Sequence, residues 1–210
     1  MHFFFDFDGP ILDVSDKFYQ TYFDILSAHG FTTLDKFHYW ELKRNNTPEK
    51  EIHLLTGASI PDFGQLRKSV IETERYQQLD KLQPAVTEVL NAAKSRGNVY
   101  LVTLRHSHEQ VVKQLQRFGI HSYFNTVLSA ADDRTPKWHI KYNLLMKHFD
   151  GTIPENSIFV GDTETDILTG KEIKSKTIAV LNGMRNLERL KYLEPDFIIP
   201  TIHELLKIKI

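Results

Sequence analysis

The chain has 210 residues, of which 41% are hydrophobic and 25% are charged, a composition typical of a globular protein with a substantial core. Lysine and arginine (26) nearly balance aspartate and glutamate (27), so a formal net charge of -1 gives no electrostatic reason to expect nucleic acid or an anionic membrane as a partner. The chain has no cysteine, which excludes disulfides, thiolate catalysis and cysteine-bound zinc, and no apolar run approaches the roughly 18 residues of a membrane span. We therefore expect a cytoplasmic protein that binds neither nucleic acid nor a membrane.

Short apolar runs predict buried β-strands at residues 2–7, 98–104, 125–130, 157–162 and 176–181. Most of these runs are continuous rather than alternating, as in strands that are covered on both faces. Helical patterns separate the later strands, and one of them begins after Ser107, a candidate N-cap, and ends at Gly119. The alternation of strand and helix from Pro84 onward predicts an α/β fold with a Rossmann-like parallel-sheet core.

The first predicted strand is followed by a long segment that contains no convincing strand. Residues 15–83 carry several helical patterns, and their aromatic side chains repeat at near-helical spacing, which favours a helical core over a base-stacking platform. We therefore predict a catalytic α/β core of residues 1–14 and 84–210 and an inserted all-helical cap of residues 15–83. Such a cap could close over the carboxyl edge of the sheet, where ligands bind in open α/β proteins.

Two acidic pairs lie at the ends of predicted strands. Asp6 and Asp8 end the first strand, and its two-residue period puts both carboxylates on one side. Asp162 follows another apolar run, and Asp166 lies about one helical turn further on. If these strands are neighbours, the carboxylates converge, and two like charges about 4 Å apart repel by roughly 4 kcal/mol at an effective dielectric near 20. Because the motifs offer only oxygen ligands, they favour Mg²⁺ as the cation that relieves this repulsion.

Two further residues suit a phosphate group. Thr103 lies at the end of a predicted strand, where its hydroxyl and the backbone N–H groups that follow could hold phosphate oxygens. Lys137 lies at the start of a predicted helix and could neutralise a phosphoryl group as a point charge. Together with the acidic pairs, they predict a site for a small-molecule phosphate ester.

Four motifs follow one another along the chain: Asp-x-Asp-Gly from Asp6, a strand ending in Thr103, Lys137 at a helix start, and Gly-Asp-x-x-x-Asp from Gly161. This order resembles the haloacid dehalogenase-like superfamily of phosphohydrolases. The helical insertion after the first strand resembles the cap of its phosphoglycolate phosphatase-like group, and the tail "PDFIIPTIHELLKI" is similar to that group's ending. The resemblance covers the whole chain and implies a Mg²⁺-dependent phosphatase that forms an aspartyl-phosphate.

The resemblance also implies a role for each acidic residue. Asp6 would be the nucleophile, and Asp8 would be the general acid for the leaving oxygen and then the base for water. Mg²⁺ would be held by Asp6, Asp162 and the backbone carbonyl of Asp8, and Asp166 would orient the ligands of the metal.

The phosphate-binding roles implied by the resemblance fall on Thr103 and Lys137, and Lys141, one turn later, is a second candidate. We favour Lys137 because 25 residues separate it from Asp162 (162 − 137), which suits one helix, a loop and a strand. Arg105 stands near a position where the family commonly has Asn, and it could hold phosphate or a substrate carboxylate, or equally face solvent.

Specificity residues are expected in the cap. Lys43, Arg44 and Asn45 lie between two predicted helices and could contact a polar or acidic leaving group, although a solvated helix end is the simpler interpretation.

Other functions stay open at this point. A phosphomutase keeps the same core, and a non-catalytic phospho-binding protein could keep the same fold, although every charged motif residue is present. A dehalogenase attacks carbon and needs no acid at Asp8, and a phospho-signalling receiver domain needs no insertion of this length. The substrate itself stays unnamed, and we expect a monomer or a homodimer.

Overall fold

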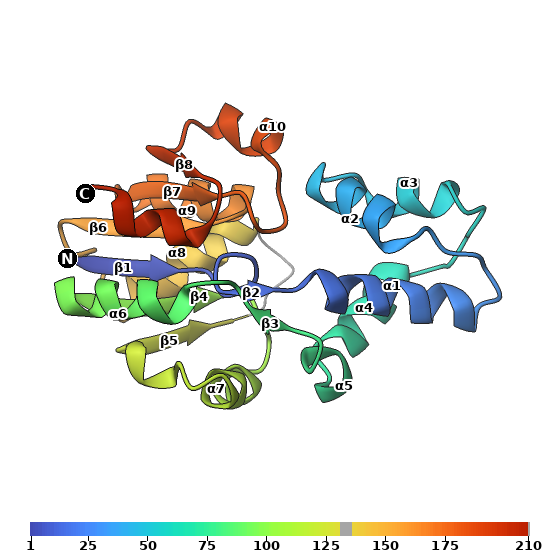
Figure 1. Cartoon of the computed structure of the whole chain (residues 1–210), viewed down its shortest axis with the longest axis horizontal. Coiled ribbons are helices and arrows are strands. Elements are labelled where there is room, and N and C mark those ends of the chain that lie inside the picture. Colours follow the sequence, from blue (N-terminus) through green and yellow to red (C-terminus); the bar gives the residue numbers. More distant parts are fainter. Residues whose placement is uncertain (131–135, 210) are drawn as a thin grey trace.

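A six-stranded parallel sheet forms the centre of the protein in the computed structural model, which describes residues 1–130 and 136–209 (Figure 1). In spatial order its strands are β5 (Thr126–Ser129), β4 (Asn98–Thr103), β1 (His2–Phe5), β6 (Ser157–Gly161), β7 (Lys176–Val180) and β8 (Phe197–Ile199). The predicted α/β fold with a Rossmann-like sheet is confirmed. Each of the five apolar runs corresponds to a strand, and β8 is a sixth, in the tail segment.

The strand β1 explains why the first apolar run is continuous. Phe3 and Phe5 belong to the core cluster on one face of the sheet, and Phe4 belongs to the cluster on the other face. All three rings are buried because side chains alternate across a strand that is covered on both sides.

Helices cover both faces of the sheet. One face packs against α6 (Val86–Arg96), α7 (His108–Arg117) and the 3₁₀ segments η1 (His121–Tyr123) and η3 (Ile202–Lys207). The other face packs against α8 (Lys137–His148) and α9 (Glu164–Glu172), and α10 (Leu187–Leu190) and η2 (Lys191–Leu193) follow β7. Ser107 caps α7 as predicted, because its hydroxyl accepts a hydrogen bond from the Gln110 N–H. Among the described helices, none combines the length and apolar character needed to cross a membrane.

Five helices lie beside the sheet as a separate group, the helical insertion (Figure 1). They are α1 (Ser15–Ala28), α2 (Lys36–Arg44), α3 (Glu49–Leu54), α4 (Phe63–Ile71) and α5 (Glu74–Gln77). The insertion has its own buried cluster, in which the rings of Tyr22 and Tyr39 stack 4.4 Å apart. The assignment of residues 15–83 as a domain of its own stays a prediction.

Two short strands join the insertion to the core. The strand β2 (Leu12–Asp13) leads out of the core, and β3 (Lys81–Leu82) leads back and pairs with it antiparallel. We expected no strand within residues 15–83, where β3 lies, and a two-residue strand is too short to produce the alternation that identifies one in a sequence. The two crossings of the chain therefore lie side by side, as in a hinge.

Candidate active site

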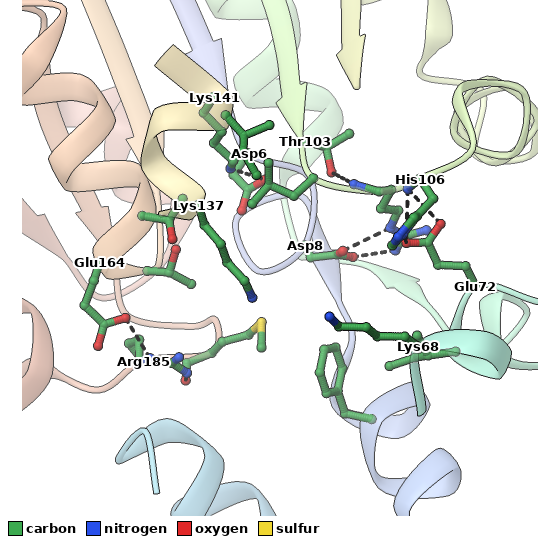
Figure 2. A pocket seen from close by; sticks show the side chains of 18 of the residues that line it. Asp6, Asp8, Lys68, Glu72, Thr103, His106, Lys137, Lys141, Glu164 and Arg185 are labelled. Atoms are coloured by element: carbon green, nitrogen blue, oxygen red, sulfur yellow. Dashed lines mark hydrogen bonds and ion pairs between the residues drawn. The ribbon is translucent and has the colours of Figure 1, made fainter. Parts of the chain in front are cut away.

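A pocket of about 530 Å³ lies at the carboxyl ends of the strands, facing the helical insertion (Figure 2). Core and insertion both contribute to its wall, which is rich in charged side chains. The charged residues of the wall are Asp6, Asp8, Lys17, Arg67, Lys68, Glu72, Arg105, Lys137, Lys141, Glu164, Arg185 and Arg189. Cations outnumber carboxylates among them, so the pocket suits an anionic ligand.

Asp6 and Asp8 both reach this pocket from the loop that follows β1. Asp6 is 7% exposed, and its Oδ1 accepts a hydrogen bond of 2.8 Å from the Phe7 N–H. The ammonium of Lys141 lies 2.7 Å from the same oxygen. The end of a central strand therefore holds the Asp6 carboxylate in a fixed orientation.

Asp162 follows the end of β6, the strand next to β1, and Asp166 lies in the first turn of α9. One carboxylate oxygen from each of Asp6, Asp162 and Asp166 lies within 4.8 Å of the others. The Oδ2 atom of Asp166 accepts hydrogen bonds from the Asp162 and Thr163 N–H groups and from the Thr163 hydroxyl, which caps α9. Its Oδ1 atom lies 2.6 Å from the Lys141 ammonium. Asp166 therefore orients both the first turn of α9 and the Lys141 ammonium.

Asp162 is enclosed by backbone. Its Oδ2 accepts a hydrogen bond of 2.5 Å from the Met184 N–H, whereas its buried Oδ1 has no hydrogen-bond partner among the described residues. A Cβ atom on Gly9, whose φ is +109°, would lie 2.1 Å from Asp162 Oδ2, and one on Gly183 would lie 2.0 Å from it. Only glycine allows the backbone at these two positions to come this close to Asp162 Oδ2. The buried Oδ1 atom of Asp162 stays open to another ligand.

Burial and crowding disfavour negative charge on two of these carboxylates. Burial, followed by the neighbouring Asp166, raises the pKa of Asp6 to about 7, and Lys141 opposes this shift. Burial, followed by Asp166 and Asp6, raises the pKa of Asp162 well above its usual value. A cation among these groups would favour their charged forms. The buried, unpartnered oxygen of Asp162 and the all-oxygen donor set fit Mg²⁺.

The two candidate lysines lie one turn apart on α8 but occupy different places. Lys137 is the first residue of the helix, is exposed, and extends into the pocket in Figure 2. Lys141 is 2% exposed and contacts both Asp6 and Asp166. The geometry thus places Lys141 beside Asp6, where the sequence favoured Lys137. The 25-residue separation also fits Lys141, because it equally separates this residue from Asp166 (166 − 141).

Thr103, the last residue of β4, and Arg105, two residues further on, differ in what they contact. Thr103 is 1% exposed and lines the pocket, as expected of a phosphate-binding hydroxyl. Arg105 is buried, and its guanidinium contacts both carboxylate oxygens of Asp8, with Nε 3.0 Å from Oδ2. It also lies 2.8 Å from Asp80. Arg105 therefore holds Asp8 rather than lying free for a substrate.

The expected specificity residues of the insertion also have other partners. Lys43 is paired with Glu49 at 2.6 Å, the guanidinium of Arg44 donates to the Leu181 carbonyl at 2.8 Å, and Asn45 accepts from Asn186 at 2.5 Å. Of the described residues that line the pocket, none is Lys43, Arg44 or Asn45. Arg44 and Asn45 contact the core instead of the solvent that the simpler interpretation gave them, and a role of these residues in specificity stays a prediction.

Sequence reasoning missed the residues that the insertion does bring to the pocket. Arg67 and Lys68 lie in α4, and Glu72 follows it and accepts a hydrogen bond of 2.9 Å from the His106 N–H. Asn46, which follows Asn45, also lines the pocket, and its side-chain oxygen accepts a hydrogen bond from Arg185 at 2.7 Å. A cationic pair in a helix is common on protein surfaces, so only the position of α4 beside the pocket distinguishes this one.

Comparison with known proteins agrees with this fold. A family model described as haloacid dehalogenase-like hydrolase matches residues 3–180. Pyrophosphatase PpaX of Bacillus velezensis is 25% identical over 210 residues, which cover 97% of this chain and 94% of that protein. Phosphoglycolate phosphatase of Escherichia coli is 27% identical over 125 residues, which cover 60% of this chain and 50% of that enzyme. A haloacid dehalogenase-like family hydrolase from Streptococcus pneumoniae shares the fold, with a TM-score of 0.78 at 21% identity over 98% of this chain and 96% of that one.

Proposed function

The chain belongs to the haloacid dehalogenase-like hydrolase family and is a phosphatase, and on this premise we propose that it hydrolyses a small phosphorylated metabolite with Mg²⁺ through an aspartyl-phosphate. One observation carries the proposal. The Asp6 carboxylate lies at the end of a central strand, 2.7 Å from the Lys141 ammonium and within 4.8 Å of an oxygen of Asp162, whose buried Oδ1 has no hydrogen-bond partner among the described residues. Such an arrangement suits a nucleophile that must approach an anionic phosphate beside a cation.

Asp6 is the nucleophile in this proposal. Among the described residues, the Phe7 N–H and the Lys141 ammonium both contact Oδ1, which leaves Oδ2 for attack on phosphorus. The new bond joins Oδ2 to phosphorus, and the bond to the leaving oxygen breaks. Mg²⁺, held by Asp6, Asp162 and the Asp8 carbonyl, would neutralise charge on the nucleophile and the phosphoryl oxygens.

Asp8 transfers the protons. It would protonate the leaving oxygen and then accept a proton from the water that cleaves the aspartyl-phosphate. Although burial raises the pKa of Asp8, the Arg105 guanidinium and the Lys17 ammonium lower it well below its usual range. The negative charge of a bound phosphoryl group would act in the opposite direction and favour the protonated acid.

The remaining residues of the pocket would bind the substrate. The Lys141 ammonium, 2.7 Å from Asp6, and the Thr103 hydroxyl, which lines the same pocket, would hold phosphoryl oxygens, and Lys137 lines this pocket from the start of α8. Arg67 and Arg185 line the part of the pocket between insertion and core. Their charge supports a polar or anionic leaving group, and a volume of about 530 Å³ suits a small metabolite.

The experiment that tests this proposal is phosphate release from a panel of phosphomonoesters and inorganic pyrophosphate, with Mg²⁺ or with chelator. The matched variants are Asp6→Asn, which is nearly isosteric, and Asp16→Asn, which removes a carboxylate paired with Lys36 and Lys81 outside the pocket. We expect Mg²⁺-dependent turnover that Asp6→Asn abolishes and Asp16→Asn retains. Trapping of radioactive phosphate on the wild-type protein would identify the intermediate. Turnover that survives in Asp6→Asn would refute the covalent route.

A further inference from the structure

Four charged side chains from four separate segments meet where the insertion joins the core: Asp8, Lys17, Asp80 and Arg105. We call them the hinge network. Asp8 lies in the loop after β1, and Lys17 lies in the first turn of α1. Asp80 is the residue before β3, and Arg105 lies in the loop after β4. Two carboxylates and two cations balance in charge, as buried ionic groups must.

Arg105 makes the decisive contacts of the hinge network. Its Nε donates to Asp8 Oδ2 at 3.0 Å, and its Nη2 contacts both Asp8 Oδ1 and, at 2.8 Å, Asp80 Oδ2. A planar guanidinium that contacts both oxygens fixes the plane and the direction of a carboxylate, which a lysine in the same place could not do.

Asp80 holds both cations of the hinge network. Its Oδ2 lies 2.8 Å from Arg105 Nη2 and 3.0 Å from Lys17 Nζ, and the Gln114 side chain donates to it at 2.8 Å. The side chain of Asp80 has no exposed surface, and Asp80 is absent from the described residues that line the pocket. Asp80 therefore has no route to a substrate except through Arg105 and Lys17, which do line it.

We infer that Asp80 is a positioning residue that, through Arg105 and Lys17, sets the direction of the Asp8 carboxylate during proton transfer to the leaving oxygen. This inference rests on the proposed function, in which Asp8 is the proton donor. Lys17 and Asp80 lie beside the two strands that cross between core and insertion. A change in the position of the insertion would therefore reach Asp8 through this network.

The need of the leaving group for a proton provides the test. The oxygen of 4-nitrophenyl phosphate leaves as a stabilised phenolate without a proton, whereas 4-nitrobenzyl phosphate, larger by one methylene, releases an alcohol that needs one. The ratio kcat/KM covers the steps up to departure of the leaving group and excludes hydrolysis of the aspartyl-phosphate. We expect Asp80→Asn to lower kcat/KM about tenfold or more for the nitrobenzyl ester and less than about threefold for the nitrophenyl ester. The tenfold loss is part of the rate enhancement of about 10²–10⁴-fold that general acid catalysis typically gives.

A matched variant controls for damage to the hinge. Asp16→Asn removes a carboxylate that neighbours Lys17 and pairs with Lys81, the neighbour of Asp80, at 2.7 Å. Its side chain is partly exposed, and the contacts described for it do not include Asp8. Any loss in this variant should be the same for both esters, because a loosened hinge alone does not distinguish one leaving group from the other.

An equal loss on both esters in Asp80→Asn, or no loss on either, would overturn the positioning role. If Asp80→Asn does not fold, Arg105→Lys decides by the same ratio, because it keeps the charge and loses the two-point contact with Asp8. Asp8→Asn separates this result from a failure of the proposed function. If Asp8→Asn itself shows no dependence on the ester, the acid role of Asp8 fails and the positioning role fails with it. An ester-dependent loss in Asp8→Asn but not in Asp80→Asn overturns only the inference on Asp80.

Discussion

Replacing Lys141 by Met should destabilise the protein far more than the same change at Lys137. The Lys141 ammonium lies 2.7 Å from Asp6 and 2.6 Å from Asp166, and each contact is worth roughly 6 kcal/mol of Coulomb attraction at an effective dielectric near 20. Because burial of the ammonium offsets much of this attraction, we expect a net loss of about 3–5 kcal/mol in the free energy of unfolding, as for other broken buried ion pairs. Lys137 is exposed, so Lys137→Met should stay within about 0.5 kcal/mol.

Urea denaturation at neutral pH, with chelator present to remove divalent cations, measures both changes. The midpoint and the slope together give the free energy of unfolding, and an unchanged slope shows that the unfolded states are comparable. A second titration with Mg²⁺ should recover part of the stability of Lys141→Met, because a cation bound to Asp6 and Asp162 takes over part of the charge balance. The reasoning fails if the two variants lose equal stability, or if Lys137→Met loses more.

Three further predictions concern the surroundings of Asp162 and the contact between insertion and core. Gly9→Ala should abolish turnover, because φ is +109° and the new Cβ would lie 2.1 Å from Asp162 Oδ2; wild-type kcat would contradict this. Mg²⁺ should raise the melting temperature of the wild type, because it binds the folded state, and this rise should be mostly lost in Asp162→Asn. An equal rise in both proteins, measured by calorimetry at increasing Mg²⁺, would exclude Asp162 as a metal ligand. Arg185→Met removes contacts to Asn46 at 2.7 Å and to Glu164 at 2.9 Å, so KM should increase several-fold with little loss of stability. An unchanged KM would show that these contacts do not help to hold the substrate.

The sequence was sufficient to predict the sheet and the acidic residues at its edge. Continuous apolar runs identify strands that are buried on both faces, and carboxylates at the ends of such strands must converge if the strands are neighbours. The adjacency of β1 and β6 satisfies that condition for Asp6 and Asp162. The pair β2–β3 was missed because two residues carry no periodicity.

The directions of long side chains could not be predicted in the same way. Lys137 and Lys141 share a helix, and only the place where α8 begins relative to the sheet decides which ammonium reaches Asp6. Arg105 is turned toward Asp8 by Asp80, which lies 25 residues away, so no local pattern indicates its partner. Arg44 likewise finds its partner far along the chain, at the Leu181 carbonyl.

The central place of β1 in the sheet has a consequence for hydrogen exchange. This strand is hydrogen-bonded to β4 on one side and to β6 on the other. Among the described residues, the insertion contacts the core through two two-residue strands, through side chains such as that of Arg44, and through the Asn186 N–H, which donates to the Arg44 carbonyl. Amides of β1 should therefore exchange only when the whole core opens, while those of the insertion exchange through smaller, local openings. A molecule whose insertion has opened locally still keeps Asp6 in place, so recovery of a complete pocket requires only that the insertion refold against an intact sheet.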